Sequence, residues 1–352
     1  MNGFIEIAGE KVGRDFPVFI IAEMSANHRQ EFDEAVRIIR AAKKAGADAV
    51  KLQTYTPDTL TMDSDSEHFR IKGTLWEGET LYSLYKRAYM PWEWHPKLKE
   101  VAEEEGIILF STPFDRTAVD FLEEMNVPAY KVASFELVDI PLIEYIAGKG
   151  KPLIMSTGMA TLEEIKEAVN AARAAGSKEI ALLKCTSAYP APPEEMNLRT
   201  IPDLAETFGV VSGLSDHTTG IAVPVAAVSL GASIIEKHFT LSRAKGGPDS
   251  AFSLEPDEFG AMVEAVRVAE KALGAVHYGL TKEEEKSRVF RRSLFVVKDM
   301  KAGDIFTEDN VRSIRPGHGL PPKHLKSIIG KKASKNIKGG TPLGWEMILT
   351  AY

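Results

Sequence analysis

Short apolar runs alternate with helical patterns through most of this chain, and the alternation limits the folds open to it. Eight apolar runs are each long enough for one buried strand, and each is followed by a segment with apolar residues at helical spacing. The runs are 19–24, 48–55, 107–114, 129–135, 152–158, 180–187, 210–217 and 233–238. Near-continuous apolar strands are typical of parallel sheets covered on both faces. Eight strand–helix units in ~270 residues therefore predict a (β/α)₈ barrel.

A doubly wound open sheet is the main alternative, but no glycine-rich phosphate-binding fingerprint follows the first strand. After Leu273 the pattern changes. Residues 281–288 are densely charged, and from Ser293 onwards short apolar runs are separated by turn signals. We therefore predict a barrel over residues 1–280, a linker over 281–292 and a small second domain over 293–352.

Composition and charge exclude several function classes. The net charge of -7 argues against nucleic-acid binding, so an anionic substrate must be held by local lysines and arginines. No apolar run reaches the ~18 residues that a membrane span needs, and the first residues do not resemble a signal peptide. The single cysteine, Cys185, excludes an intramolecular disulfide framework. A cytoplasmic protein without membrane contact is the expectation.

Two histidines end neighbouring strands within residues 213–240. This stretch reads as strand, helix and strand, which makes a parallel unit with both strands pointing the same way. His217 and His238 are then expected at one end of the sheet, where two imidazoles suit a divalent metal. The alternative is two core histidines, each bonded to a backbone carbonyl, and the sequence alone leaves both interpretations open.

Polar residues gather at the other strand ends as well, where barrel enzymes carry their active sites. Taken singly, each has a structural explanation, such as a helix cap or a surface lysine. Taken together, lysines, hydroxyls and helix N-termini predict an anion site. The residues are Glu23, Lys51, Gln53, Thr112, Lys131, Ser134, Glu136, Ser156, Ser187, Tyr189, Ser215 and Glu236. The residues alone thus favour a metal-assisted barrel enzyme acting on an anionic substrate.

A set of motifs, in this order, resembles the sialic acid synthase family over essentially the whole chain. They are IAEMSANH, KLQTYTPDTL, FSTPF, YKVASFE, STGM, KCTSAYPAP, GLSDHT and IEKHFT. The last 60 or so residues resemble the antifreeze-like SAF domain that follows the barrel in this family. The resemblance implies condensation of phosphoenolpyruvate with an open-chain N-acetylated amino sugar, giving a nine-carbon 2-keto acid and phosphate.

The resemblance also implies roles for particular residues and for partners. A divalent ion, commonly Mn²⁺ with Mg²⁺ or Co²⁺ as alternatives, would bind His217 and His238. Catalytic positions would be Glu23, Lys51, Lys131 and Glu136. Substrate-binding positions would be Gln53, Thr112, Ser134, Ser156, Ser187, Tyr189, Ser215, Asp249 and Arg315, with Ser187 standing where many members have asparagine. A homodimer is implied, in which Arg315 of the SAF domain reaches the sugar site of the partner subunit.

The sugar is less constrained than the family. The SANH of Ser25–His28 and the insert at 75–95 resemble the branch whose acceptor is 2,4-diacetamido-2,4,6-trideoxy-altrose. N-acetylmannosamine and a legionaminic acid precursor are the alternatives within the family. Outside it, a non-catalytic carbohydrate- or ice-binding protein and a metal-dependent aldolase or isomerase that does not consume phosphoenolpyruvate stay open.

Overall fold

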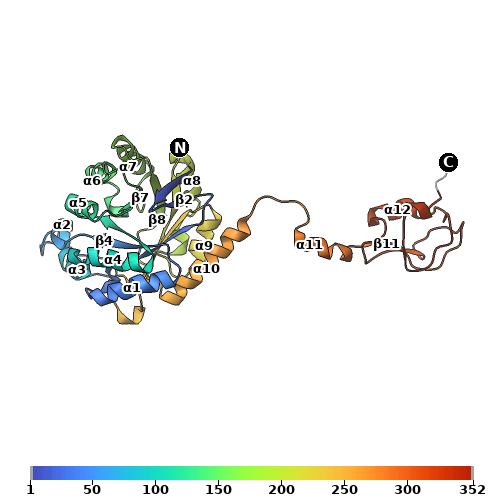
Figure 1. Cartoon of the computed structure of the whole chain (residues 1–352), viewed down its shortest axis with the longest axis horizontal. Coiled ribbons are helices and arrows are strands. Elements are labelled where there is room, and N and C mark those ends of the chain that lie inside the picture. The colour runs from blue at the N-terminus through green and yellow to red at the C-terminus, as the bar shows by residue number, and fades with distance from the viewer. Residues whose placement is uncertain (1–2, 350–352) are drawn as a thin grey trace. The chain divides into compact units, whose positions relative to one another are not determined.

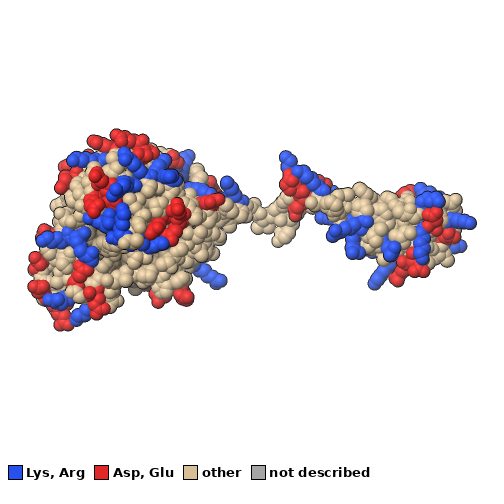
Figure 2. Space-filling model, turned by 90° about the horizontal axis from the view of Figure 1, so that it is seen from below, with Lys and Arg blue, Asp and Glu red and all other residues tan. Residues whose placement is uncertain are grey.

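The structure is a computed structural model that describes residues 3–349. The chain divides after Gly274 into two units, and each is described by itself. Figure 1 shows the first unit as a ring of helices around a bundle of strands. Within the described residues, no helix combines the length and the apolar character that crossing a membrane requires. On the surface seen in Figure 2, cationic and anionic side chains are interspersed.

The first unit is a closed barrel of eight parallel strands, which confirms the predicted fold. The strands are β3 (Phe19–Glu23), β4 (Ala49–Thr54), β5 (Ile108–Pro113), β6 (Tyr130–Val132), β7 (Leu153–Ser156), β8 (Ile180–Cys185), β9 (Val211–Asp216) and β10 (Ile234–His238). They pair in sequence order, and β10 closes the ring by pairing in parallel with both β9 and β3. Because every strand runs the same way, all carboxyl ends meet at one rim.

Seven principal helices connect these strands on the outside of the barrel, and an eighth, α10, follows the last strand (Figure 1). They are α1 (Phe32–Lys44), α4 (His95–Glu105), α5 (Arg116–Glu124), α6 (Ile140–Ala147), α7 (Leu162–Ala174), α8 (Thr200–Phe208), α9 (Ala222–Ser229) and α10 (Pro256–Leu273). Local sequence fixes their starts. Asp115 accepts from the Thr117 and Ala118 amides to cap α5, and Thr161 forms a capping box with Glu164 at α7.

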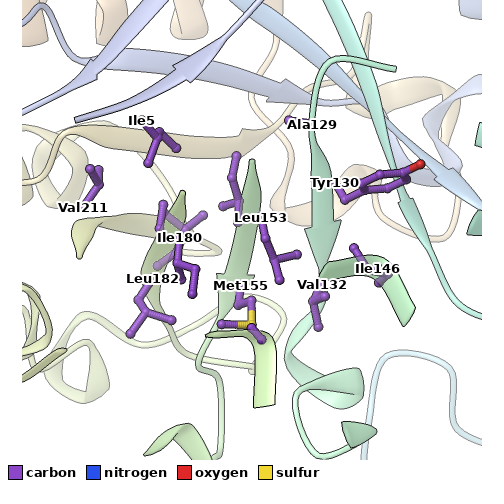
Figure 3. Packing of buried hydrophobic residues seen from close by; sticks show 14 of the residues in the cluster. Ile5, Ala129, Tyr130, Val132, Ile146, Leu153, Met155, Ile180, Leu182 and Val211 are labelled. Carbon is purple, nitrogen blue, oxygen red and sulfur yellow. The ribbon is translucent and has the colours of Figure 1, made fainter. Parts of the chain in front are cut away.

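A hairpin that the sequence analysis did not anticipate precedes the barrel. Strands β1 (Phe4–Ile7) and β2 (Glu10–Gly13) pair antiparallel, and Ile5, Ile7 and Val12 are buried. These side chains join the cluster formed by residues at the amino ends of the barrel strands, as Figure 3 shows for Ile5 and Val211. The hairpin therefore packs against the end of the barrel opposite the carboxyl rim.

A long excursion separates β4 from α4. It carries two short helices, α2 (Pro57–Leu60) and α3 (Leu81–Ala88), each started by a threonine capping box. The ring of Tyr85 in α3 packs edge-on against Tyr55, with the centroids 5.8 Å apart. The excursion is thus tied to the chain that leaves the carboxyl end of β4.

The second unit has its own small core. Strands β11 (Ser293–Val296), β12 (Val311–Ile314) and β13 (Thr341–Pro342) form an antiparallel sheet in the order β12-β11-β13. Helix α12 (Leu325–Ile328) packs beside them, and helix α11 (Lys282–Ser287) lies within the predicted linker. Leu294, Val296, Phe306 and Ile328 are fully buried in this core. Short strands and turns over these residues agree with the predicted SAF-like domain.

Candidate active site

A cavity of about 480 Å³ opens among the residues at the carboxyl ends of the barrel strands. Its polar lining comes from strands and loops all around the rim. It includes Glu23, Ser25, Lys51, Gln53, Lys131, Ser134, Glu136, Ser156, Tyr189, Ser215, His217, Glu236, His238 and Asp249. Most of the residues predicted from the sequence therefore converge on one cavity. Thr112, Ser187 and Arg315 are the predicted residues that do not line it.

Strand alternation and register place these side chains together. Glu23 on β3 stands opposite Lys51 on β4 and opposite His238 on β10. Glu236 precedes His238 by two positions, so both point to the same face of β10, and Glu236 stands opposite Ser215 on β9. Three neighbouring strand ends thus supply a carboxylate, a lysine and a histidine at one level of the barrel.

Two lysines and two carboxylates form the charged floor of the cavity, a name used here for Glu23, Lys51, Lys131 and Glu236. Lys51 Nζ lies 2.6 Å from Glu23 Oε2 and 3.6 Å from Glu236 Oε1, and Lys131 Nζ lies 3.5 Å from the same Glu236 oxygen. All four side chains are buried. One carboxylate therefore bridges two lysines. Glu236 was among the polar strand-end residues found in the sequence, but the family resemblance gave it no catalytic or binding role.

Burial and pairing compete in setting the charges of this floor. Burial lowers the pKa of Lys131, against the pull of Glu236. Burial also disfavours the charge on Lys51, but Glu23 and Glu236 outweigh it and raise its pKa. For Glu236 the two lysines outweigh burial and lower the pKa, whereas burial dominates at Glu23 and raises it. Glu23 is thus the floor carboxyl that protonates more readily.

Hydroxyl groups orient the two lysines. Lys51 Nζ donates to Thr112 Oγ1 at 3.2 Å, and Lys131 Nζ donates to Ser156 Oγ at 2.7 Å. Thr112 therefore acts on the cavity through Lys51.

Gly158, the glycine of the STGM motif, allows the backbone to pass close to the side chains of Ser134 and Ser187. Gly158 has a φ of +37°, and a Cβ there would come within 2.5 Å of Ser134 Oγ and 2.8 Å of Ser187 Oγ. Only glycine accommodates both the left-handed backbone and this contact. Ser187 thus lies against the back of the site, next to Ser134.

The two predicted metal-binding histidines lie side by side. Their ring centroids are 5.2 Å apart. His217 Nδ1 lies 2.9 Å from the Thr186 carbonyl, which favours the tautomer that leaves Nε2 free as a ligand. His238 Nδ1 is buried and has no hydrogen-bond partner among residues 3–349. Burial, together with the positive charges of Lys51 and Lys131, lowers the pKa of His238 well below its usual value, so its ring is neutral as a metal ligand must be.

These residues fit a weakly held, exchangeable divalent ion. Within the described part of the chain, no cluster of three or more histidine, cysteine, aspartate or glutamate side chains is arranged to hold a metal. Two imidazoles alone leave most coordination positions to water and substrate oxygens, as in an open catalytic site.

Cys185 Sγ lies 3.8 Å from His217 Nδ1 and also lines the cavity, which the sequence analysis did not expect.

A chain of hydrogen bonds connects the floor to the loop after β10. Gln53 Nε2 donates to Glu23 Oε1 and to Ser25 Oγ, both at 2.9 Å, and Ser25 Oγ donates to Asp249. Ser25 adopts a left-handed backbone with φ +46°, which is unusual for a residue other than glycine. Burial raises the pKa of Asp249 against these bonds. Ser25, which follows the end of the first predicted strand, is thus a site residue to which the sequence analysis assigned no role.

Glu136 stands apart from the floor. Its Oε2 is buried and has no hydrogen-bond partner within residues 3–349. Burial raises the pKa of Glu136 to about 7, although Lys131 acts in the opposite direction. This carboxyl therefore changes its protonation near neutral pH.

Apolar side chains from the excursion after β4 form the outer wall of the cavity. We use this name for Leu60, Ile71, Trp76, Leu81, Leu84 and Ala88. Trp76 Nε1 donates to the Pro248 carbonyl at 3.0 Å, and the ring centroid lies 5.9 Å from that of Tyr189. The ring centroid of Tyr189 in turn lies 4.5 Å from that of His217. The sequence analysis did not predict this wall.

Fold and site together define a barrel enzyme whose carboxyl rim carries a buried, charged cavity with two adjacent histidines. The chain belongs to the NeuB family, whose match covers residues 38–278, and a SAF domain matches residues 291–349. It is 51% identical to pseudaminic acid synthase from Campylobacter jejuni, over 94% of this chain and 96% of that protein. It is 37% identical to N,N'-diacetyllegionaminic acid synthase from Legionella pneumophila, over 96% of each chain.

A solved structure agrees with this assignment. The N-acetylneuraminic acid synthetase of Leptospira borgpetersenii, in complex with citrate, superimposes with a TM-score of 0.71 at 34% identity. The match covers 81% of this chain and 94% of that one. The resemblance drawn from the motifs is therefore confirmed at the level of family, barrel and SAF domain. Arg315 directly follows β12 in the second unit, and its role stays a prediction.

Proposed function

We propose that this protein is a pseudaminic acid synthase. It condenses phosphoenolpyruvate with open-chain 2,4-diacetamido-2,4,6-trideoxy-altrose, giving the nonulosonic acid and inorganic phosphate. The single observation that carries the proposal is the arrangement of Lys51 and Lys131 on Glu236, in the same cavity as the histidine pair. The choice of sugar is supported by the higher identity to a pseudaminic acid synthase than to a legionaminic acid synthase.

The charged floor binds the three-carbon donor. Phosphoenolpyruvate carries a phosphate and a carboxylate, and Lys51 and Lys131 are the lysines of the cavity lining. Ser134, Ser156 and Ser215 add hydroxyl donors around them. Because these groups are buried and already oriented, they stabilise negative charge more strongly than they would in water. Donor binding brings negative charge close to Glu23 and Glu236, so one of these carboxyls takes up a proton when the donor enters.

The histidine pair holds the metal and faces the acceptor. His217 and His238 would bind a divalent ion, for which we propose Mn²⁺, with Mg²⁺ or Co²⁺ as alternatives. When bound, such an ion supplies Lewis acidity that polarises the acceptor aldehyde. Gln53, Tyr189 and Asp249 line the same part of the cavity and position the sugar.

The remaining residues manage water and protons. In the overall reaction C3 of phosphoenolpyruvate bonds to the aldehyde carbon, one water adds at C2, and the C2–O bond to phosphate breaks. Glu23, held by Lys51 and Gln53, positions the aldehyde or the water. Glu136, with its pKa of about 7, exchanges the proton that the new hydroxyl and the departing phosphate require.

We also propose a cytoplasmic homodimer, in which residues 281–292 link the barrel to a SAF domain that crosses to the partner subunit. An apolar rim beside the cavity supports a covering partner. Phe135 and Val138 follow β6, Met159 and Leu162 follow β7, and all four are more than half exposed. In this arrangement Arg315 reaches the sugar site of the second copy.

A phosphate-release assay tests the proposal directly. Purified protein is given phosphoenolpyruvate, Mn²⁺ and one of three sugars: the trideoxy-altrose, its legionaminic counterpart or N-acetylmannosamine. We expect phosphate release with the first and a much slower rate with the others. Turnover with N-acetylmannosamine alone would assign the protein to another branch of the family. No turnover with any sugar would favour the non-catalytic alternative.

A further inference from the structure

The outer wall differs from the rest of the cavity in having almost nothing that can pair with a hydroxyl group. Leu60, Ile71, Leu81 and Leu84 have no polar side-chain atoms. The indole nitrogen of Trp76, the wall's polar atom, already donates to the Pro248 carbonyl. Tyr55, Thr74 and Tyr85 are the polar side chains that the same excursion adds to the lining, and none of them belongs to the wall. A sugar hydroxyl placed against the wall side chains themselves would lose its water without gaining a partner from them.

The position of the wall determines which part of the acceptor meets it. The reacting aldehyde belongs beside His217 and His238, and the donor occupies the floor. Trp76 is separated from His217 by a single ring, that of Tyr189. The end of the sugar farthest from the aldehyde therefore extends from the histidines past Tyr189 towards Trp76.

We propose that Trp76 and the outer wall determine specificity by selecting a methyl group over a hydroxymethyl group at C6 of the acceptor. This inference rests on the proposed function, since it assumes a sugar acceptor with its aldehyde at the histidines. The selection arises because either group must lose its water when it contacts the wall. A methyl group gains apolar contact with the indole, whereas a hydroxymethyl group leaves a buried hydroxyl unpaired. Apolar pockets discriminate against an added hydroxyl by about 100-fold at most, and we expect a preference of about 10- to 100-fold here.

The experiment compares two acceptors that differ only at C6: the 2,4,6-trideoxy sugar and its 6-hydroxy analogue. We measure kcat/KM for each in the wild type and in two variants of Trp76. Trp76→Phe keeps an apolar ring but loses the bond to Pro248. Trp76→Gln keeps a donor for Pro248 but makes the wall polar. We expect Trp76→Phe to retain the preference within about threefold and Trp76→Gln to reduce it about tenfold.

Two further variants complete the design. Ile71→Gln introduces the same polar group elsewhere on the wall and should also lower the preference. Leu75→Gln is the matched control, because Leu75 neighbours Trp76 but is 53% exposed and does not line the cavity. The KM for phosphoenolpyruvate should stay the same in all four variants, and thermal unfolding confirms that each is folded.

The outcomes separate this inference from the proposed function. A wild type that uses both acceptors equally, or a Trp76→Gln variant with an unchanged preference, would overturn the specificity role while the synthase activity stands. An equal effect of Leu75→Gln would overturn it as well. A wild type that releases no phosphate with either acceptor would contradict both proposals.

Discussion

The charged floor and the outer wall belong to one cavity but are built in opposite ways. The floor comes from barrel strands, is buried, and is held by ion pairs of 2.6 to 3.6 Å and by hydroxyls behind them. The wall comes from an excursion between β4 and α4, and of its six residues only Leu84 and Ala88 are buried. The rigid scaffold thus carries the charges, and the inserted segment carries apolar surface. With the proposed function, this division would separate reaction chemistry from the choice of sugar.

That difference implies that floor substitutions should abolish or slow turnover with every sugar, whereas wall substitutions should change the ranking of sugars. Barrel folds in general place chemistry at strand ends and vary their loops. Substitutions in the floor, at the histidine pair, at Glu136 and at Gly158 test the first half of this expectation.

The largest expected effect is that of His238→Ala. Since His238 Nδ1 has no partner among the described residues, its removal should leave the fold intact while removing half of the metal site. We expect kcat/KM to fall by about 10³-fold or more for every sugar, because metal polarisation contributes several kcal/mol. Mn²⁺ binding, measured by calorimetry or electron paramagnetic resonance, should weaken in parallel.

His277→Ala serves as the control, because His277 is exposed in the second unit. It should leave Mn²⁺ binding and turnover unchanged. Full Mn²⁺ affinity in His238→Ala would show that the paired histidines are not the metal site.

A smaller loss is expected for Lys131→Met. The substitution removes a buried cation from the floor, so kcat/KM for phosphoenolpyruvate should fall by about 10²- to 10³-fold. Glu236 keeps Lys51 and Ser215 as partners, and the free energy of unfolding should fall by about 1–3 kcal/mol. Lys184→Met is the matched control, since Lys184 lies near the carboxyl end of β8, two strands from Lys131 in the barrel, and outside the cavity lining. If both variants lose the same activity, the floor has no special role.

The sequence predicted the floor better than the wall for a physical reason. Parallel strands bring their carboxyl ends to one rim whatever the loops do, so Lys51, Lys131 and the histidines could be placed from strand position alone. Glu236 has the same signal, but a lone carboxylate beside lysines reads equally well as their partner. Leu81, Leu84 and Ala88 lie at helical spacing on α3, but Leu60, Ile71 and Trp76 share no period with them, and only the path of the excursion brings the six together.

The strands, too, were predicted well where the apolar pattern was long and were missed where it was short. All eight strands lie within the predicted runs, although β6 is shorter than its run because a 3₁₀ turn begins at Ser134. The hairpin formed by β1 and β2 was missed, since two four-residue strands give too short a pattern to separate from irregular chain. Its alternating Ile5 and Ile7 are buried only because the barrel lies beneath them.

Glu136, which lines the same cavity as the floor, should make turnover depend on pH. Because burial raises its pKa to about 7, the wild-type kcat/KM should fall above pH 7 as the acid form is lost. Glu136→Gln should lower turnover about 100-fold and remove that limb of the profile. Stability gives an independent check. The folded state binds this proton more tightly than the unfolded state, so the wild type should lose stability relative to Glu136→Gln as pH rises from about 4.5 to 7. An unchanged limb in the variant would assign the titration to another group.

The smallest effect is expected from two glycine substitutions. They test how closely Ser134 and Ser187 are packed beside the cavity. Gly158 and Gly150 both have positive φ, but a Cβ at Gly158 would press on Ser134 and Ser187, whereas one at Gly150 would meet nothing within 4 Å. Gly150→Ala should therefore cost only the left-handed backbone, about 1–2 kcal/mol of unfolding free energy. Gly158→Ala should cost more and, by displacing Ser134, should raise the KM for phosphoenolpyruvate several-fold while the ranking of sugars stays as in the wild type. Equal unfolding midpoints for the two variants and an unchanged KM would mean that Ser134 and Ser187 move aside freely, and that this side of the cavity is not closely packed.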